Sequence, residues 1–259
     1  NREVMMMNFT LSNQVQIPAV GIGTFMMTPD QAEQAVVDAL ACGYRMIDTA
    51  QAYMNERAVG RGIKRSGVAR EDIFISTKIW ASQYLTEGTV EKSLELLGTD
   101  YIDLMFIHQP AGDFMAGYRK LETVAIRPMV NQIEMHPYFA QESALKVMEE
   151  YQIVPEAWAP LGGGRHNPFD NEMVKEIAAA HGKTVGQVVL RWNVQRGVVV
   201  IPKSVHKARI EENFQIWDFT LTEEEMQKIS SLDLGYQGTA VKHFDPEFVK
   251  MCNIRKIHE

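Results

Sequence analysis

The sequence predicts an α/β fold in which parallel strands, each followed by a helix, close into a (β/α)8 TIM barrel. Short apolar runs alternate with longer amphipathic segments, the pattern of parallel strands joined by helical crossovers. The 259 residues match the length of about 250 that one such barrel needs. The first strand ends in Gly21-Ile22-Gly23-Thr24 without the third glycine of a GxGxxG fingerprint, which disfavours an open dinucleotide-binding sheet. We therefore expect one barrel domain over residues 1–259.

Strands are expected where apolar residues run almost continuously, because both faces of a parallel sheet are buried. They cover residues 19–23, 45–48, 73–78, 101–108, 129–134, 154–158 and 198–202. Helices are expected where apolar residues recur at helical spacing, and Gly43 and Gly98 stand where such helices end. They cover residues 31–42, 56–65, 89–97, 117–122, 144–151, 171–181 and 184–196.

Composition excludes several classes of partner. The chain has 33 acidic and 26 basic residues, a net charge of −7, and no basic run, so a nucleic-acid partner is not expected. No apolar stretch approaches the roughly 18 residues of a membrane helix, so no membrane partner is expected either. The two cysteines, Cys42 and Cys252, form no zinc or disulfide pattern. We expect a cytoplasmic monomer without a metal, acting on a small molecule.

Three polar residues each close a predicted strand. Asp48, Lys78 and His108 follow one another at intervals of 30 residues, one strand-plus-helix unit at a time. In a parallel barrel the carboxyl ends of all strands open onto the face where the chemistry lies. Tyr53 follows Asp48 by five residues, close enough for the next loop to return it to that face. We therefore expect the four side chains to meet.

This quartet suits the protonation of a carbonyl oxygen. Free tyrosine titrates near pH 10, and a lysine ammonium beside Tyr53 would lower its pKa by favouring the phenolate. Asp48 would keep Lys78 charged and oriented, and His108 could hydrogen-bond the carbonyl oxygen of a substrate. The alternative is that these are ordinary polar groups at strand ends, an explanation that weakens when all four fall in register.

Three long motifs then occur in order along nearly the whole chain. They are GYRMIDTA at 43–50 with YMNE at 53–56, LMFIHQP at 104–110, and IPKSV at 201–205 continuing to EENF at 211–214. Together they resemble the signatures of the aldo-keto reductase family, near its branch of 2,5-diketo-gluconate reductases and prostaglandin F synthases. The resemblance implies NADPH-dependent reduction of aldehydes or ketones to alcohols, with hydride from nicotinamide and a proton from Tyr53. Asp48, Lys78 and His108 would support Tyr53, and Trp80 and His108 would line the substrate pocket.

The resemblance also implies the residues that bind NADPH. They are Thr24, Asp48, Gln132, Trp158, Lys203, Ser204, Arg209, Glu212 and Asn213. Two cations and a hydroxyl, from Lys203, Arg209 and Ser204, suit the adenosine 2′-phosphate. The alternative function is a catalytically silent NADPH-binding barrel that acts as a regulatory or interaction subunit. A metal-dependent hydrolase would need clustered histidine and acidic ligands at the strand ends, where only His108 is found.

One part of the barrel is absent from the sequence. Only seven strands can be counted, whereas the family has eight, and helix 117–122 runs almost directly into strand 129–134. The fifth strand-plus-helix unit, about 30 residues with a Ser-Asn pair for the nicotinamide carboxamide, is expected between Glu122 and Thr123. Either this sequence omits the unit or the protein has lost it, and a true loss would put the reductase activity in doubt.

Overall fold

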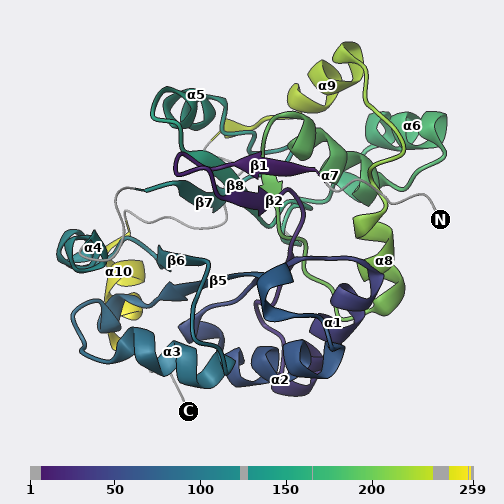
Figure 1. Ribbon diagram of the computed structural model, residues 1–259. Coiled ribbons are helices and arrows are strands. Elements are labelled where there is room, and N and C mark those ends of the chain that lie inside the picture. Colours follow the sequence, from purple (N-terminus) through teal and green to yellow (C-terminus); the bar gives the residue numbers. More distant parts are fainter. Residues whose placement is uncertain (1–6, 123–127, 165, 236–244, 256, 258–259) are drawn as a thin grey trace. The chain divides into compact units, whose positions relative to one another are not determined.

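The computed structural model describes the chain except for residues 1–6, 123–127, 165, 236–244, 256 and 258–259 (Figure 1). The junction between Glu122 and Thr123 therefore lies outside the described residues. Two compact units are present. Unit 1 comprises Asn1–Gly21, Pro128–Pro202 and Ala208–Ala240, and unit 2 comprises Ile22–Arg127, Lys203–Lys207 and Val241–Glu259. The expectation of one domain over residues 1–259 stays a prediction.

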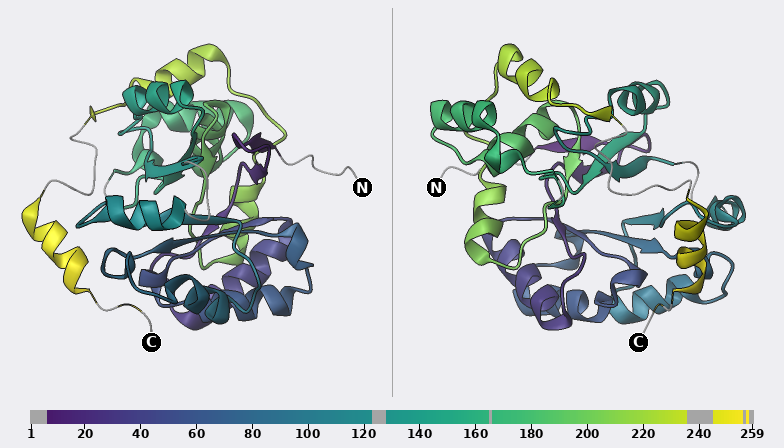
Figure 2. Two further views of the ribbon diagram at one scale, coloured as in Figure 1. Left: turned by 60° about the vertical axis from the view of Figure 1, so that its left-hand side comes forward. Right: turned by 180° about the vertical axis from the view of Figure 1, so that it is seen from behind.

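Unit 2 is built on four parallel strands in sequential order: β3 (Ile22–Gly23), β4 (Met46–Asp48), β5 (Phe74–Ile79) and β6 (Leu104–Ile107). The strands are joined by α1 (Pro29–Cys42), α2 (Glu56–Ser66) and α3 (Thr89–Leu97), which lie along one face of the sheet (Figures 1 and 2). All six residues of β5 are buried, as expected for a strand covered on both faces. The unit also contains α4 (Phe114–Glu122) and α10 (Pro246–Ile254).

Helix α1 shows why the helices form where they do. It begins two residues before the predicted start because Thr28 caps it in a capping box with Gln31, and Pro29 occupies the first turn. It ends at Gly43, whose φ of 114° is left-handed and therefore favours glycine. The predicted stop signal is thus confirmed, and Gly98 ends α3 in the same way.

Unit 1 contains a parallel sheet of β7 (Val130–Glu134), β8 (Val154–Trp158) and β9 (Val199–Val200), together with the hairpin β1 (Asn8–Thr10) and β2 (Gln16–Pro18). The start of the predicted strand 19–23 belongs here, because Val20 forms a parallel bridge with Val200. Helices α5 (Glu142–Glu150), α6 (Glu172–His181), α7 (Val185–Gln195) and α9 (Glu223–Ser230) accompany the sheet. The chain re-enters this unit through α8 (Lys207–Phe214).

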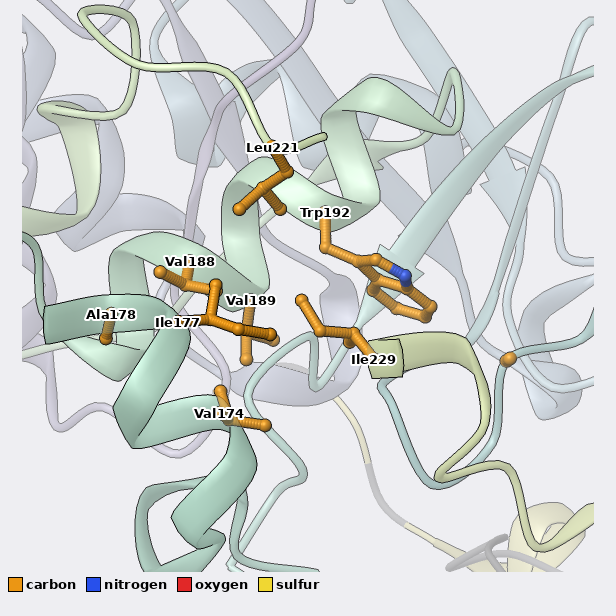
Figure 3. Close-up of a cluster of buried hydrophobic side chains, with 9 residues drawn as sticks. Val174, Ile177, Ala178, Val188, Val189, Trp192, Leu221 and Ile229 are labelled. Atoms are coloured by element: carbon orange, nitrogen blue, oxygen red, sulfur yellow. The ribbon is translucent and has the colours of Figure 1, made fainter. Parts of the chain in front are cut away.

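An apolar cluster in unit 1 packs helices α6 and α7 against the chain around α9 (Figure 3). Val174 and Ile177 of α6 meet Val188 and Trp192 of α7, and all four are buried. The indole N–H of Trp192 donates to the Ser230 hydroxyl at 3.1 Å, so the largest side chain of the cluster is buried without an unsatisfied donor.

The described residues contain seven parallel strands, each in a predicted range except that β5 extends one residue further, to Ile79. Besides short 3-10 helices, the elements that the sequence analysis missed are the hairpin, α8, α9 and α10. The chain passes from β6 to β7 with α4 as the one regular element described between them. In the described part of the chain, no helix combines the length and apolar character needed to cross a membrane.

Gly60 in α2 allows this helix to pack closely against the end of α3. A Cβ atom at Gly60 would lie 2.3 Å from the carbonyl oxygen of Leu97, and backbone cannot move as a flexible side chain can. We expect Gly60→Ala to lower the free energy of unfolding by about 1–3 kcal/mol, although alanine normally favours a helix by about 1 kcal/mol. Urea denaturation measures the change.

Gly186 in α7 provides the matched control, because its added Cβ would approach other atoms no closer than 3.6 Å. Gly186→Ala should leave stability unchanged or raise it. Equal effects of the two substitutions would contradict the assigned role of the close contact between Gly60 and Leu97.

Candidate active site

Lys78 is the centre of the predicted quartet. Its Nζ donates to Asp48 Oδ1 at 2.6 Å, to the Thr49 carbonyl oxygen at 2.8 Å and to the Tyr53 hydroxyl at 3.2 Å. Both members of the Lys78–Asp48 ion pair are almost completely buried, at 3% and 2% side-chain exposure. Three of the four predicted side chains therefore meet through one ammonium group.

Strand register explains this meeting. β4 and β5 are adjacent and parallel, with Asp48 opposite Ser76. Side chains alternate along a strand, so Ser76 and Lys78 lie on the same face. The Ser76 hydroxyl donates to Asp48 Oδ2 at 2.9 Å, so both carboxylate oxygens of Asp48 are held. Ser76 was missed in the sequence analysis, although its position two residues before Lys78 could have identified it.

Tyr53 reaches Lys78 from a short 3-10 helix, η1 (Gln51–Tyr53), which follows β4 directly. Asn55 holds this segment in place: its amide donates to the carbonyl oxygens of Thr24 and Met27 at 3.0 and 3.2 Å, and its oxygen accepts from the Thr49 hydroxyl at 3.0 Å. Asn55 belongs to the YMNE motif, but no role was predicted for it. Its buried amide fixes the turn that carries Tyr53.

His108 follows β6 and extends the sheet, because its N–H donates to the Ile79 carbonyl oxygen at 2.9 Å. Its ring stands edge-on to Tyr53, with ring centroids 5.7 Å apart, and edge-on to Trp80 at 4.9 Å. Removal from water, with the charges of Lys78 and Arg255, holds the pKa of His108 well below its usual value. The ring is therefore neutral at pH 7 and offers one N–H donor.

Trp80 is the residue after β5, and its ring lies edge-on to that of His108. Its side chain is 3% exposed, and its indole N–H donates to the Cys252 carbonyl oxygen at 2.7 Å. Its backbone N–H donates to Gln51 Oε1 at 3.1 Å, while the Gln51 amide donates to Thr89 and Ser93 in α3. Gln51, two residues before Tyr53, thus ties the Tyr53 segment to the end of β5.

A second buried carboxyl group, Glu56, lies behind the sheet. It accepts a hydrogen bond from the Thr77 hydroxyl at 2.6 Å and a longer one from Ser93 at 3.4 Å. Burial raises the pKa of Glu56, and the two hydroxyl groups and the charge of Lys78 oppose that rise. Thr77 and Lys78 are consecutive residues of β5, so Glu56 supports the strand from the face opposite the site.

The predicted cofactor residues lie in both units. Thr24 is fully buried, and its hydroxyl donates to the Asp48 carbonyl oxygen at 3.0 Å, so it braces the quartet. Gln132 and Trp158 lie in neighbouring strands of unit 1, and the Gln132 amide donates to Glu156 at 2.6 Å. Trp158 is half-buried at the end of β8.

The remaining predicted cofactor residues follow β9. Lys203 and Arg209 are exposed, on either side of the first residue of α8. Ser204 is buried, and its hydroxyl accepts from the His206 N–H at 3.1 Å. Asn213 is also buried, and Glu212 accepts from the Thr184 hydroxyl at 2.9 Å. The two cations are thus the most accessible of these groups.

Comparison with known proteins supports the resemblance. The sequence profile of the Aldo/keto reductase family matches residues 19–124 and 115–234 in two overlapping segments, which meet next to the proposed junction. A 9,11-endoperoxide prostaglandin H2 reductase of Trypanosoma cruzi is 42% identical, covering 86% of this chain and 90% of its own.

That alignment runs over 257 positions, whereas 86% of 259 residues is about 223, so about 34 positions have no residue of this chain. This length agrees with the absent unit of about 30 residues.

Further relatives agree in sequence and fold. A glyoxal reductase of Bacillus subtilis is 41% identical, covering 86% of this chain and 91% of its own. An aldo-keto reductase from a deep-sea metagenome library superposes with a TM-score of 0.87 at 38% identity, over 92% of this chain and 98% of that one. An aldo-keto reductase of Bombyx mori in complex with NADP gives 0.84 at 29% identity, over 95% and 97%. The predicted (β/α)8 barrel class is confirmed, and the chain belongs to the aldo-keto reductase family.

Proposed function

We propose that the protein reduces aldehydes or ketones to alcohols, with hydride from NADPH and a proton from Tyr53. The observation that carries this proposal is the position of the Lys78 ammonium, which contacts the Tyr53 hydroxyl at 3.2 Å and the Asp48 carboxylate at 2.6 Å. An ammonium group held charged beside a phenol stabilises the phenolate that remains once the proton has left.

The described residues fit an NADP cofactor. Lys203 and Arg209 present exposed cations beside the start of α8, and cations at a helix N-terminus suit a phosphate group. A family member has been crystallised with NADP. We expect Trp158 and Gln132 to contact the nicotinamide, and Glu212 and Asn213 the adenine. Bound NADPH supplies the hydride.

The roles of the site residues follow from their contacts. The substrate oxygen accepts hydrogen bonds from the Tyr53 hydroxyl and from the neutral His108 ring, whose depressed pKa keeps it uncharged. Phe25, with its ring 5.0 Å from that of Tyr53, and Trp80 surround this position with aromatic surface. Asp48 keeps Lys78 charged as the proton leaves Tyr53. We expect a small carbonyl compound as the substrate and a cytoplasmic monomer as the acting form.

A second function is favoured by one observation, the absent fifth unit. The family profile matches in two segments, and about 34 positions of a relative have no counterpart here. A chain without the Ser-Asn pair could bind NADPH without turnover and act as a regulatory or interaction subunit. Absorbance at the reduced-nicotinamide band, followed with a panel of aldehydes and ketones, separates the two functions. Binding of NADPH without oxidation would favour the silent subunit.

Tyr53→Phe tests the proton donor. The substitution keeps the ring and removes only the hydroxyl, so we expect turnover to fall by about 10²–10⁴-fold, the range typical of lost general acid catalysis. NADPH binding, measured by fluorescence titration, should be retained. Near-normal turnover would exclude Tyr53 as the donor.

The buried ion pair predicts that substitutions of Lys78 and Asp48 affect stability and activity differently. Lys78→Met leaves the Asp48 carboxylate buried without its ammonium partner, so the free energy of unfolding should fall by about 3–5 kcal/mol. The double substitution Asp48→Asn with Lys78→Met removes both charges and should recover much of this loss in urea denaturation. Activity should remain lost in both variants. A double variant as unstable as the single one would contradict the assigned energetics.

Arg209→Ala tests the phosphate contact. We expect NADPH binding to weaken by about 1.5–3 kcal/mol, the scale of a hydrogen bond to a charged group, while NADH binding changes little. Lys146→Ala, which removes an exposed charge from α5, is the matched control and should affect neither cofactor. Equal losses for NADPH and NADH with Arg209→Ala would show that the 2′-phosphate binds elsewhere.

A further inference from the structure

Tyr84 contacts the backbone that carries the His108 ring. It follows a short 3-10 helix, η3 (Ala81–Gln83), in the loop after β5. Its hydroxyl lies 2.7 Å from the His108 carbonyl oxygen and 2.6 Å from that of Gln109, so its one hydrogen is shared between two acceptors. The N–H of His108 donates to the Ile79 carbonyl oxygen at 2.9 Å. Both backbone polar groups of His108 therefore have a partner.

The residue after His108 has an unusual backbone conformation. Gln109 is left-handed with a φ of 56°, which residues other than glycine rarely adopt. Its carbonyl oxygen accepts from the Tyr84 hydroxyl and also from the Ala111 N–H at 2.6 Å. A conformation of this kind persists only where the surrounding contacts fix it. The Tyr84 hydroxyl is one of those contacts, and it joins the His108 and Gln109 carbonyl groups in one turn.

The Tyr84 ring is itself closely packed. Tyr84 is 4% exposed and lies in an apolar cluster with Trp80 and Ala111. On another side is Gly117 of α4, where an added Cβ atom would lie 2.8 Å from both Cβ and Cγ of Tyr84. Burial raises the pKa of the Tyr84 hydroxyl, which therefore stays protonated at neutral pH and remains a donor. The ring is thus held by contacts that do not depend on its hydroxyl.

From these contacts we propose that Tyr84 is a positioning residue of the reductase: its hydroxyl holds the backbone of His108 so that the ring meets the substrate oxygen beside Tyr53. This role rests on the proposed function, in which the neutral His108 ring donates to that oxygen. The ring stands edge-on to Tyr53 and to Trp80, with centroids 5.7 and 4.9 Å apart. A shift of the His108 backbone carries the ring with it, and a small misplacement of a group that orients the reacting atoms costs rate.

Tyr84→Phe tests this role because it keeps the packed ring and removes only the hydroxyl. With 4-nitrobenzaldehyde and NADPH, we expect kcat to fall by roughly ten- to a hundred-fold, the scale of a small misplacement of a reacting group, with a smaller change in KM. Tyr101→Phe is the matched control, since Tyr101 is exposed and its ring packs against Arg70. It should change neither constant. An unchanged kcat in Tyr84→Phe would overturn the proposal.

A double-mutant cycle shows whether Tyr84 acts through His108. Once His108→Ala has removed the ring, loss of the Tyr84 hydroxyl has no ring left to displace. We therefore expect Tyr84→Phe to cause no further loss of rate in the His108→Ala background, measured with enzyme in excess so that slow reduction can be followed. The same fold-loss in both backgrounds would overturn the proposal, because it would show an effect on the protein that does not pass through His108.

The position of the His108 ring can also be measured without turnover. The nearby Tyr53 and Trp80 rings make the NMR chemical shift of the His108 Cε1 proton sensitive to its position, and loss of the signal in His108→Ala assigns it. We expect this signal to move in Tyr84→Phe and to stay in place in Tyr101→Phe, with urea denaturation confirming that both variants are folded.

This signal separates the inference from the proposed function. If the wild-type protein reduces no aldehyde or ketone, the proposed function fails, and the His108 signal alone then decides whether Tyr84 positions the ring. A shift that is confined to Tyr84→Phe would support that contact, and an unchanged signal would overturn it.

Discussion

The buried ion pair of Lys78 and Asp48 is the interaction on which the rest of the site depends. Taking two charges out of water costs several kcal/mol per ion, and only close geometry with further hydrogen bonds offsets that cost. Here Ser76 holds the second carboxylate oxygen, and the Thr49 carbonyl and Tyr53 hydroxyl take the other ammonium contacts. The pair therefore constrains strands β4 and β5 and the turn that follows β4. Tyr53 faces the ammonium because that turn has little other freedom.

Around the pair, neutral polar side chains link the Tyr53 turn to the neighbouring elements without adding charge. Asn55 joins the loop after β3 to the Tyr53 turn, and Gln51 joins that turn to Trp80 and α3. Each of these amides is buried and would be costly if left without partners. Glu56 is also buried nearby and is an ionisable group. Burial raises its pKa and thus favours its neutral form. Asn55 and Gln51 add no charge, and the Lys78 ammonium is the charged group that contacts the Tyr53 hydroxyl directly.

A chain with a net charge of −7 can still bind anions, because binding depends on local rather than total charge. Exposed Lys203 and Arg209 stand on either side of the first residue of α8 in the sequence, and the Arg255 guanidinium lies 5.3 Å from the centroid of the Trp80 ring. Two cations of this kind suit the cofactor phosphate that we propose for them. The unit expected between Glu122 and Thr123 bears on closure of the barrel and on the nicotinamide contacts that the resemblance implies.

The sequence alone determined the alternation of strands and helices and brought the quartet together, because the carboxyl ends of parallel strands, where Asp48, Lys78 and His108 stand, meet at one edge of the sheet. The resemblance of the three long motifs identified the family. The sequence could not show that Asn55 and Gln51 fix the Tyr53 turn, since most of their partners lie far along the chain and several are backbone groups without a residue signature. Nor could it place Arg255, which lies more than 200 residues from Ala52 along the chain. Only the packing of α10 on Trp80 decided that contact, because burial of Cys252 rather than any local pattern brings the end of α10 to Trp80.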